Sequence, residues 1–181
     1  KGELVWYVPE KMRAHRQTAR PGDRERFEQP KVLVKDTTTD FAGTYDDKNL
    51  YVKDVLIVIP QVGEQAPVDL RFIAGVVNSK ALLFYYRSTF QTIHVQCEEL
   101  SSLPVPMIDI NKRTDKARHD QMVHFVDQML DAKKQLANAK TDKDKTYYEN
   151  KCASLDRQID RLVYELYELT PEEIAIVEGQ E

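Results

Sequence analysis

A heptad repeat of apolar residues near the C-terminal end of the sequence constrains the fold more than any other feature. Alternating spacings of four and three residues separate its seven positions, which are Tyr148, Cys152, Leu155, Ile159, Leu162, Leu166 and Leu169. Because an α-helix has about 3.6 residues per turn, this spacing brings all seven side chains onto one narrow face. The repeat therefore predicts a long amphipathic helix whose apolar seam packs against another helix.

A second amphipathic stretch precedes the heptad and supplies a partner helix. Apolar side chains recur at helical spacing from about residue 115 to residue 140. They are Met122, Phe125, Val126, Met129, Leu130 and Leu136. The polar segment 141–145 is a short connector, so the two helices are expected to form an antiparallel hairpin. Thr170, Pro171 and Glu173 then carry the pattern of a capping box, which predicts the start of a further short helix.

The first 110 residues have a different pattern, in which short apolar runs alternate with segments rich in turn-forming residues. Short strands are predicted at residues 4–8, 31–35, 55–59 and 92–95. A loop or twisted hairpin is expected around residues 41–45. Two short helices are predicted, one at 70–77 and one from about residue 80. Asp69 is expected to cap the first, and Asn78 or Ser79 the second.

Together these patterns predict an α+β fold with two parts. Residues 1–110 are expected to form an irregular, twisted, β-rich module, and residues 111–181 a C-terminal antiparallel α-helical hairpin with a short final helix. With 181 residues, 41% of them hydrophobic, the chain is long enough to bury a core without disulfide staples. Cys97 and Cys152 indicate neither a disulfide framework nor a zinc site, and Cys152 falls on the apolar seam.

Basic residues concentrate at the N-terminal end, although the whole chain carries a net charge of −4. The first 35 residues hold nine Lys and Arg against five Asp and Glu. The clustered basic residues are Lys11, Arg13, Arg16, Arg20, Arg24, Arg26, Lys31 and Lys35. Arginine predominates, and its planar guanidinium suits phosphates and guanine edges. The alternative is a solvated loop whose arginines pair only with its own acids.

The motifs of common enzyme families are missing from the sequence. There is no glycine-rich dinucleotide or phosphate loop, no HExxH zinc motif and no GxSxG nucleophile motif. The four histidines do not have metal-ligand spacing. No apolar run approaches the ~20 residues that span a bilayer, so we expect no membrane partner. The two widely spaced cysteines are typical of reduced thiols, so we expect a cytoplasmic location. No catalytic and no metal-ligating residue is predicted.

Five segments in order resemble a known family. They are QPKVLVKDTT, FAGTYDDKNLYVKDVLIVI, DLRFIAGVVNSKALLFYYR, LSSLPVP and LDRQIDRLVYELYELTPEEIAIVEG. In this order, over about residues 28–179, they resemble the TaqI-like C-terminal specificity domain. That domain forms the target-recognition end of many DNA adenine methyltransferases and of fused restriction-modification enzymes. The resemblance implies a twisted β module followed by a helical hairpin, as the sequence pattern does.

The resemblance also implies a parent protein with further parts. A methyltransferase domain that binds S-adenosylmethionine lies N-terminal to such specificity domains. Its catalytic loop, Asn or Asp followed by Pro-Pro-aromatic, does not occur in this sequence. We therefore expect an excised C-terminal part without its own enzymatic activity, from a site-specific adenine methyltransferase with or without a fused endonuclease. Its expected partners are double-stranded DNA and the methyltransferase domain of the same parent chain.

The assignment of DNA-binding residues rests on charge clustering, because the resemblance maps no individual base contact. The eight clustered basic residues are expected to contact phosphates, and a subset to meet base edges in the major groove beside polar side chains. These polar side chains are Thr37, Thr38, Thr39 and Asn49. Turn formation is the alternative role for the threonines, and helix capping for Asn78.

A second hypothesis assigns function to the helical arm rather than to the basic segment. An apolar seam from Tyr148 to Leu169 could dock a partner subunit or a second copy of the chain, without direct readout of DNA. A third hypothesis, a nuclease or transferase acting alone, is disfavoured by the missing motifs.

Overall fold

The fold is α+β, with a small antiparallel sheet and a majority of helical residues. The computed structural model describes residues 10, 14, 24–35, 42–52, 56–60, 68–90 and 94–179. In chain order, the labelled elements are α2 (Arg24–Phe27), β1 (Lys31–Lys35), β2 (Gly43–Asp46), β3 (Leu56–Pro60), α3 (Leu70–Val77), α4 (Lys80–Thr89), α5 (Cys97–Ser101), α6 (Arg113–Asn138), α7 (Asp142–Leu166) and α8 (Pro171–Val177).

The described strands form one sheet in the order β2-β1-β3, and both pairings are antiparallel. In the centre of the sheet, Val32 lies opposite Tyr45 on one side and Ile59 on the other. Successive side chains of a strand point to opposite faces, so Val32 and Val34 share one face. Both are completely buried and belong to the main hydrophobic core, which places that core on the helical side of the sheet.

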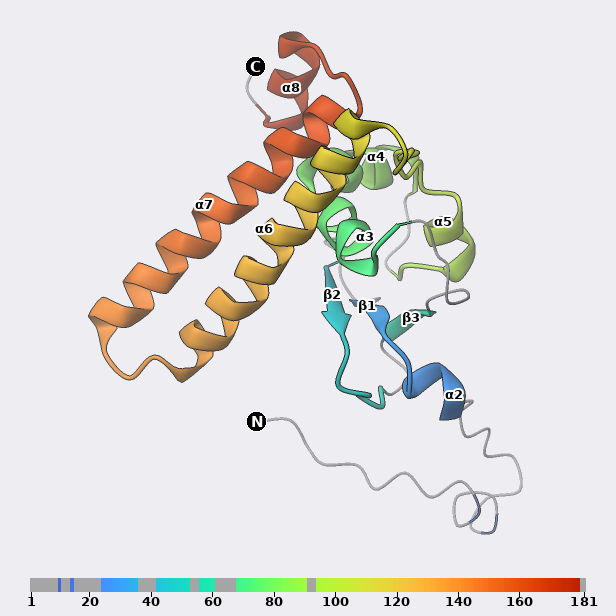
Figure 1. Ribbon diagram of the computed structural model, residues 1–181, viewed down its shortest axis with the longest axis vertical. Helices are drawn as coiled ribbons and strands as arrows, with labels where there is room; N and C mark the ends of the chain where they lie inside the picture. Colours follow the sequence, from blue (N-terminus) through green and yellow to red (C-terminus); the bar gives the residue numbers. More distant parts are fainter. Residues whose placement is uncertain are drawn as a thin grey trace.

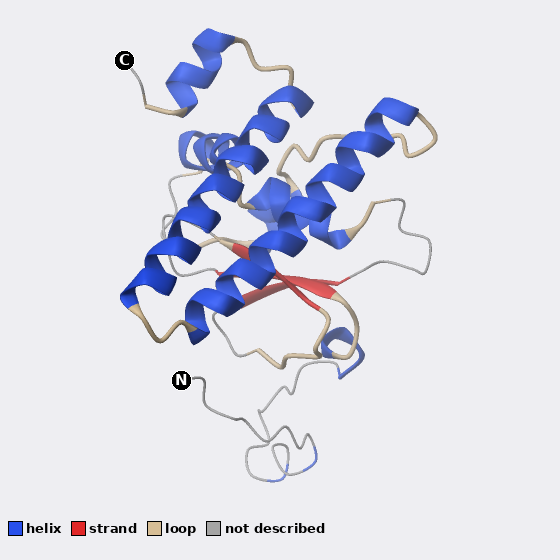
Figure 2. Ribbon diagram, turned by 60° about the vertical axis from the view of Figure 1, so that its left-hand side comes forward, coloured by secondary structure: helices blue, strands red, loops and turns tan. Residues whose placement is uncertain are grey.

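Helix α3 is sandwiched between this sheet and two long helices. Figure 2 shows the two long helices side by side, with one of them crossing in front of the sheet. Helix α3 contacts α6 and α7 on one side and β1 and β2 on the other. The two long helices run in opposite directions and are joined by residues 139–141 (Figure 1). The predicted seam of α7 faces α6, since Cys152 and Leu155 are buried against Ala132. The seam residues Ile159 and Leu162 continue into the main core.

A glycine allows α3 and α6 to approach closely. Met122 of α6 is completely buried and lies against Gly75 of α3. A Cβ atom at Gly75 would lie 2.9 Å from Met122 Cγ, closer still to its sulfur, and 3.2 Å from Val126 Cγ2. Real Cβ atoms essentially never lie within 3.0 Å of another heavy atom, so a side chain at this position would have to displace the buried Met122. Glycine therefore serves this crossing by leaving space rather than by its backbone conformation.

The predicted helix caps are present, and they separate the roles of two neighbouring residues. Asp69 caps α3 by accepting from Arg71 N, and Ser79 caps α4 by accepting from Leu82 N. Asn78 is instead the C-cap of α3. Thr170 and Glu173 form the predicted capping box of α8, with Pro171 at its first turn.

Several other predictions have different outcomes. The strands predicted at 31–35 and 55–59 are present as β1 and β3, whereas 4–8 and residues 92–93 lie outside the described residues. His94 and Val95 are not in a strand, and the short helices α2 and α5 were not predicted. The β-rich character expected of residues 1–110 is not met in their described part, where helical residues outnumber strand residues. The predicted boundary near residue 110 stays a prediction. The main core draws on both sides of it, from Val32 to Tyr164.

No helix in the described part of the chain is both long enough and apolar enough to cross a membrane.

Substituting Gly75→Ala is expected to destabilise the fold by about 1–3 kcal/mol, because the added methyl group overpacks the α3–α6 crossing. Urea denaturation measures the free energy of unfolding. Met122→Ala alone is expected to cost about 2–5 kcal/mol. The double variant should cost clearly less than the sum of the two, since removing the Met122 side chain makes room for the new methyl group. Strictly additive costs would contradict this account of the crossing.

Candidate nucleic-acid interface

Helix α2 and the turn after β2 lie together at one end of the sheet. The rings of Phe27 and Tyr51 stack with their centroids 4.9 Å apart. The Tyr51 hydroxyl donates to Glu28 Oε1 over 2.8 Å. Through these contacts, Phe27 at the end of α2 and Glu28 directly after it are both held against Tyr51, which follows the turn. They make one surface from two segments about twenty residues apart in sequence.

A buried ion pair fixes the shape of the turn. The ammonium group of Lys31 is completely buried, contacts the carboxylate of Asp46, and donates to Phe27 O over 2.7 Å. The same carboxylate accepts from the backbone amides of Lys48 and Leu50 over 3.0 and 2.9 Å. The Lys31–Asp46 pair thereby connects β1, the end of α2 and the turn, and the Asp46 carboxylate accepts three hydrogen bonds.

The electrostatics of Asp46 follow from these contacts. Burial acts to raise the pKa of its carboxyl group. The hydrogen bonds from Lys31 and from the two turn amides act in the opposite direction and prevail, so the pKa is lowered from its ordinary value. Asp46 is therefore ionised at neutral pH, and its charge is paired within the protein.

The outside of this surface carries basic, acidic and polar side chains, since Glu25, Glu28 and Asp47 are exposed there as well. Arg24 and Arg26 of α2 are exposed, the former over 71% of its side chain, and Lys48 and Asn49 are exposed on the turn. Asn49 has φ of 57°, in the left-handed region that asparagine tolerates better than most residues. Arg24 Nε lies 2.8 Å from Glu28 Oε1, and the hydrogen bond from Arg24 is the main cause of the lowered pKa of Glu28. This exposed pair contributes little to stability, so a competing phosphate can displace it.

The structure places the predicted DNA-binding residues in three different situations. Six of them lie outside the described residues: Lys11, Arg13, Arg16, Arg20, Thr37 and Thr38. The same holds for Thr39. Arg24, Arg26 and Asn49 lie on the surface formed by α2 and the turn. Lys35 is exposed and lies at the opposite end of β1 from this surface. Lys31 is opposite Asp46 at one end of the strand, and the backbone amide of Lys35 donates to Ala42 O at the other end.

The assignment of Lys31 to DNA binding needs correction. Its ammonium group has no exposed surface and is occupied by Asp46 and Phe27, so it holds the turn rather than a phosphate. Sequence reasoning missed Lys48, whose side chain is exposed on the turn where that of Lys31 is buried. Its signal was a basic residue within the turn-forming run DDKN.

Asn78 connects the edge of the sheet to α3. Its side-chain oxygen accepts from Gly43 N over 3.0 Å, and its nitrogen donates to Gly43 O over 2.8 Å and to Ala74 O over 2.7 Å. The side chain thus satisfies the backbone groups that Gly43 directs away from β1 at the edge of the sheet. These bonds give Asn78 a structural role and leave no donor for a base edge.

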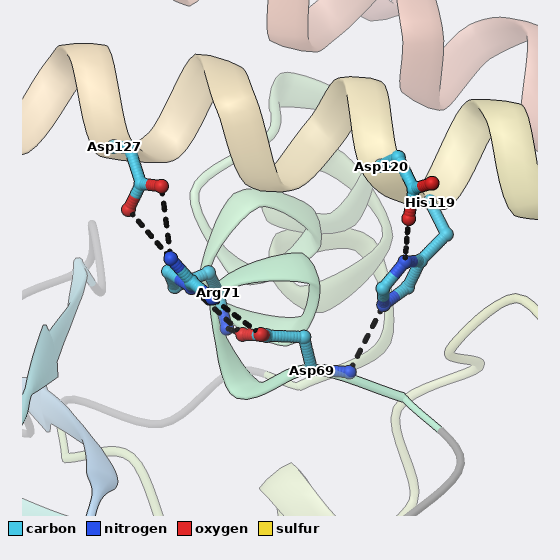
Figure 3. A network of polar contacts seen from close by, with 5 residues as sticks. All are labelled: Asp69, Arg71, His119, Asp120 and Asp127. Carbon is cyan, nitrogen blue, oxygen red and sulfur yellow. Dashed lines mark hydrogen bonds and ion pairs between the residues drawn. The ribbon is translucent and has the colours of Figure 1, made fainter.

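A polar network joins the start of α3 to α6 (Figure 3). Arg71 donates to Asp69 Oδ2 over 2.7 Å and to Asp127 Oδ2 over 2.8 Å. On the other side, Asp69 N donates to His119 Nε2 over 3.0 Å, and His119 Nδ1 lies 3.0 Å from Asp120 Oδ1. The hydrogen bond from Arg71 is the main cause of the lowered pKa of Asp69. Because each charge has its partner, the network positions α3 rather than performing chemistry.

A groove of about 480 Å³ separates the turn from α6, but its charges are balanced. Its charged lining residues include Lys48, Arg71 and Lys134 together with Asp46, Asp47, Asp127 and Asp131. Carboxylates at this density repel phosphates. The groove is therefore a poor site for a DNA backbone, and the exposed arginines of α2 beside the turn are taken as the candidate. In the described parts of the chain, no group of three or more His, Cys, Asp or Glu residues could hold a metal ion.

Comparison with family models identifies the first three-fifths of the chain. The model of the TaqI-like C-terminal specificity domain matches residues 1–105. The chain belongs to this family. The matched specificity domain includes the basic N-terminal segment, the whole sheet and α2 to α5. No curated protein matches the sequence.

The family match covers a shorter part of the chain than the resemblance seen in the sequence. The sequence segments that suggested the family ran to residue 179, whereas the match ends at residue 105, before α6. The candidate interface lies inside the specificity domain, because α2, β1 and the turn all precede residue 52. Membership connects the domain with sequence specificity in restriction-modification enzymes.

In the whole chain, Asp46→Asn is expected to lower the free energy of unfolding by about 3–5 kcal/mol at pH 7, because it leaves the buried Lys31 charge unpaired. A carboxyl group with a lowered pKa stabilises the fold above its unfolded-state pKa of about 4, and this contribution is lost as the pH falls through the folded-state value. The difference between wild type and variant should therefore shrink below about pH 4. Denaturation across a pH series measures it.

Asp47→Asn is the matched control, because Asp47 is next to Asp46 in sequence and its carboxylate is exposed. It is expected to change the free energy of unfolding by no more than about 0.5 kcal/mol. Equal losses in the two variants would mean that the Lys31–Asp46 pair does not anchor the turn.

Proposed function

We propose that this chain recognises a specific sequence in double-stranded DNA, as the target-recognition part of a site-specific DNA adenine methyltransferase of a restriction-modification system. The family match over residues 1–105 carries the proposal. The exposed arginines of α2 beside a polar turn support it, because phosphate contacts and base contacts need these two kinds of side chain.

In this proposal, the basic residues fix the register of the domain on the duplex. Arg24 and Arg26, together with Lys11, Arg13, Arg16 and Arg20, contact phosphates. Asn49, with Thr37 and Thr38, contacts base edges in the major groove, where each base pair has a distinct pattern of donors and acceptors. Lys35 contacts the backbone from the opposite end of β1, and Lys48 joins the set on the turn.

The rigidity of the turn supports a role in readout. The Asp46 carboxylate holds the amides of Lys48 and Leu50 on either side of Asn49. A side chain that is already oriented loses less conformational entropy when it binds a base. Discrimination between bases depends on such fixed geometry, since a mobile side chain can adapt to a wrong base pair.

Chemistry is assigned to a neighbouring domain of the parent. That domain binds S-adenosylmethionine, which supplies the methyl group, and carries the Pro-Pro-aromatic loop that this sequence lacks. Adenine must leave the base stack to be modified, so the duplex has to be held while the base is flipped. Holding and selecting the duplex are the tasks of the residues in this chain. Whether the parent also cleaves DNA depends on a further domain.

The alternative function, docking of a partner through the heptad seam, has less support. The seam residues Cys152, Leu155, Ile159 and Leu162 are buried against α6 and the core of the same chain. Their apolar surface is therefore already covered within one molecule.

Removing the two exposed arginines of α2 should weaken duplex binding. In the Arg24→Ala/Arg26→Ala variant, log affinity is expected to fall less steeply with log salt, the magnitude of the slope decreasing by roughly 0.9 for each lost phosphate contact. Fluorescence anisotropy with a labelled duplex of mixed sequence measures the affinity across a salt series. This probe reports the sequence-independent contacts, for which the recognised site need not be known.

Arg157→Ala/Arg161→Ala is the matched control, because it removes the same charge from exposed positions of α7. It should leave the slope unchanged. Equal losses in the two variants would show that net charge matters and α2 does not, and absence of salt-dependent binding by the wild type would contradict the proposed DNA interface.

A further inference from the structure

A cluster of exposed apolar side chains lies at the end of the molecule opposite the candidate DNA interface. Phe84 and Tyr85 of α4 are exposed over 41% and 40% of their surface, and Ile176 of α8 over 59%. Figure 1 shows α8 packed over α4 at one end of the long axis, with α2 at the other end. Single exposed apolar residues are ordinary, but a group of aromatic and aliphatic side chains at one place indicates a binding surface.

These side chains line a groove of about 360 Å³ between α4 and α8. Its apolar wall includes Phe84, Tyr85, Pro104, Tyr167, Leu169 and Ile176. Its volume lies near the lower end of the range for binding sites of small molecules and is sufficient for one or two large side chains.

Specific polar contacts in and around the groove wall hold the groove open. Glu178 at the end of α8 contacts the Lys80 ammonium and accepts from the Tyr164 hydroxyl over 2.7 Å. The Tyr167 hydroxyl donates to Pro104 O over 2.6 Å, and burial raises the pKa of this hydroxyl to about 12, so it remains a donor at neutral pH. Asp160 of α7 accepts from Lys80 N over 2.8 Å at the start of α4. The groove is thus formed before any partner binds.

The rim of the groove on the α8 side is strongly acidic. From Leu162 to Glu181 the chain has six Glu and no Lys or Arg. Glu173 lines the groove and caps α8. Glu168 and Glu172 are exposed and adjoin groove-lining residues in sequence, and Glu168 also lines the neighbouring hollow over α7. This charge excludes nucleic acid as the occupant, since phosphates would meet carboxylates. It also disfavours a second copy of the chain, which would bring the same acidic rim against it.

We propose that the groove between α4 and α8 binds a polypeptide segment in which apolar or aromatic side chains are flanked by Lys and Arg. The apolar side chains fill the groove, and the basic residues pair with Glu168 and Glu172 on the rim. An amphipathic helix presents this combination, with apolar anchors on one face and basic residues beside them. The site requires no part of the proposed DNA interface, and a partner bound here leaves α2 accessible.

Two synthetic helical peptides of about eighteen residues test the proposal. Both have the same Leu and Phe positions on one face, and they differ only in having Lys or Glu at the flanking positions. Fluorescence anisotropy should show binding of the Lys-flanked peptide to the whole chain at least about ten-fold tighter than binding of the Glu-flanked peptide. A Glu168→Gln/Glu172→Gln variant should reduce this preference and the salt dependence of binding.

Variants of the groove identify the surface that is used. Phe84→Ser/Ile176→Ser should weaken binding of the Lys-flanked peptide at least about ten-fold. Tyr147→Ser, which removes an exposed aromatic ring at the start of α7, should leave it unchanged. Circular dichroism verifies that all variants are folded. Because the substituted groove side chains are partly exposed, they can be replaced without emptying the core.

Several outcomes would overturn the proposal. These are absence of peptide binding, equal affinity for the two peptides, and equal losses in the groove variant and in Tyr147→Ser. Sedimentation that shows a dimer of the wild type, lost in the groove variant, would assign the groove to a second copy instead. Loss of duplex binding in the groove variant, with peptide binding unchanged, would assign it to DNA. Failure of duplex binding alone would affect only the proposed DNA function.

Discussion

The contact between Gly75 and Met122 is the constraint on which the rest of the fold depends. It brings α3 close enough to α6 for one layer of side chains to serve both the sheet and the long helices. Hydrogen bonds then fix α3 at both ends, since Asp69 binds His119 at its start and Asn78 binds Gly43 at its end. With α3 held in this way, the sheet has one orientation relative to α6 and α7.

Polar groups in the described parts of the chain serve mainly to position its elements. The Lys31–Asp46 pair shapes the turn, Arg71 joins α3 to α6, and Glu178 fixes α8. The charges of Lys31 and Asp46 are buried, and a buried charge is costly unless it is paired and hydrogen-bonded, so this contact specifies one arrangement. The ion pairs of Arg71 and Glu178 are partly exposed and position their elements by hydrogen-bond geometry. The surfaces proposed for DNA and for a polypeptide lie on either side of this framework. They differ in character, one arginine-rich and the other apolar with an acidic rim.

The features predictable from the sequence are those determined by local patterns. The long helices follow from periodicity, and the caps at Asp69, Ser79 and Thr170 follow from residues within one helical turn. The burial of Lys31 could not be predicted, because it depends on a partner fifteen residues away on another strand. The pairing of Arg71 with Asp127 spans 56 residues. The sequence did carry a signal for the start of helix α5, because Gln96 and Glu99 form a capping box. The helix has only five residues, so no apolar periodicity supported that signal.

The unit of sequence similarity in this chain is smaller than the unit that folds. The family match ends at residue 105, yet Phe72, Ala74 and Val76 share their core with Met122, Val126 and Val163. If recombination exchanges specificity between relatives at the boundary of the matched domain, the incoming sheet and α3 must fit an α6 and α7 that evolved with another partner. The crossing at Gly75 then limits which exchanges yield a folded protein. For the DNA interface proposed here, new specificities should arise more readily by substitution on the surface of α2 and the turn than by exchange of the whole domain.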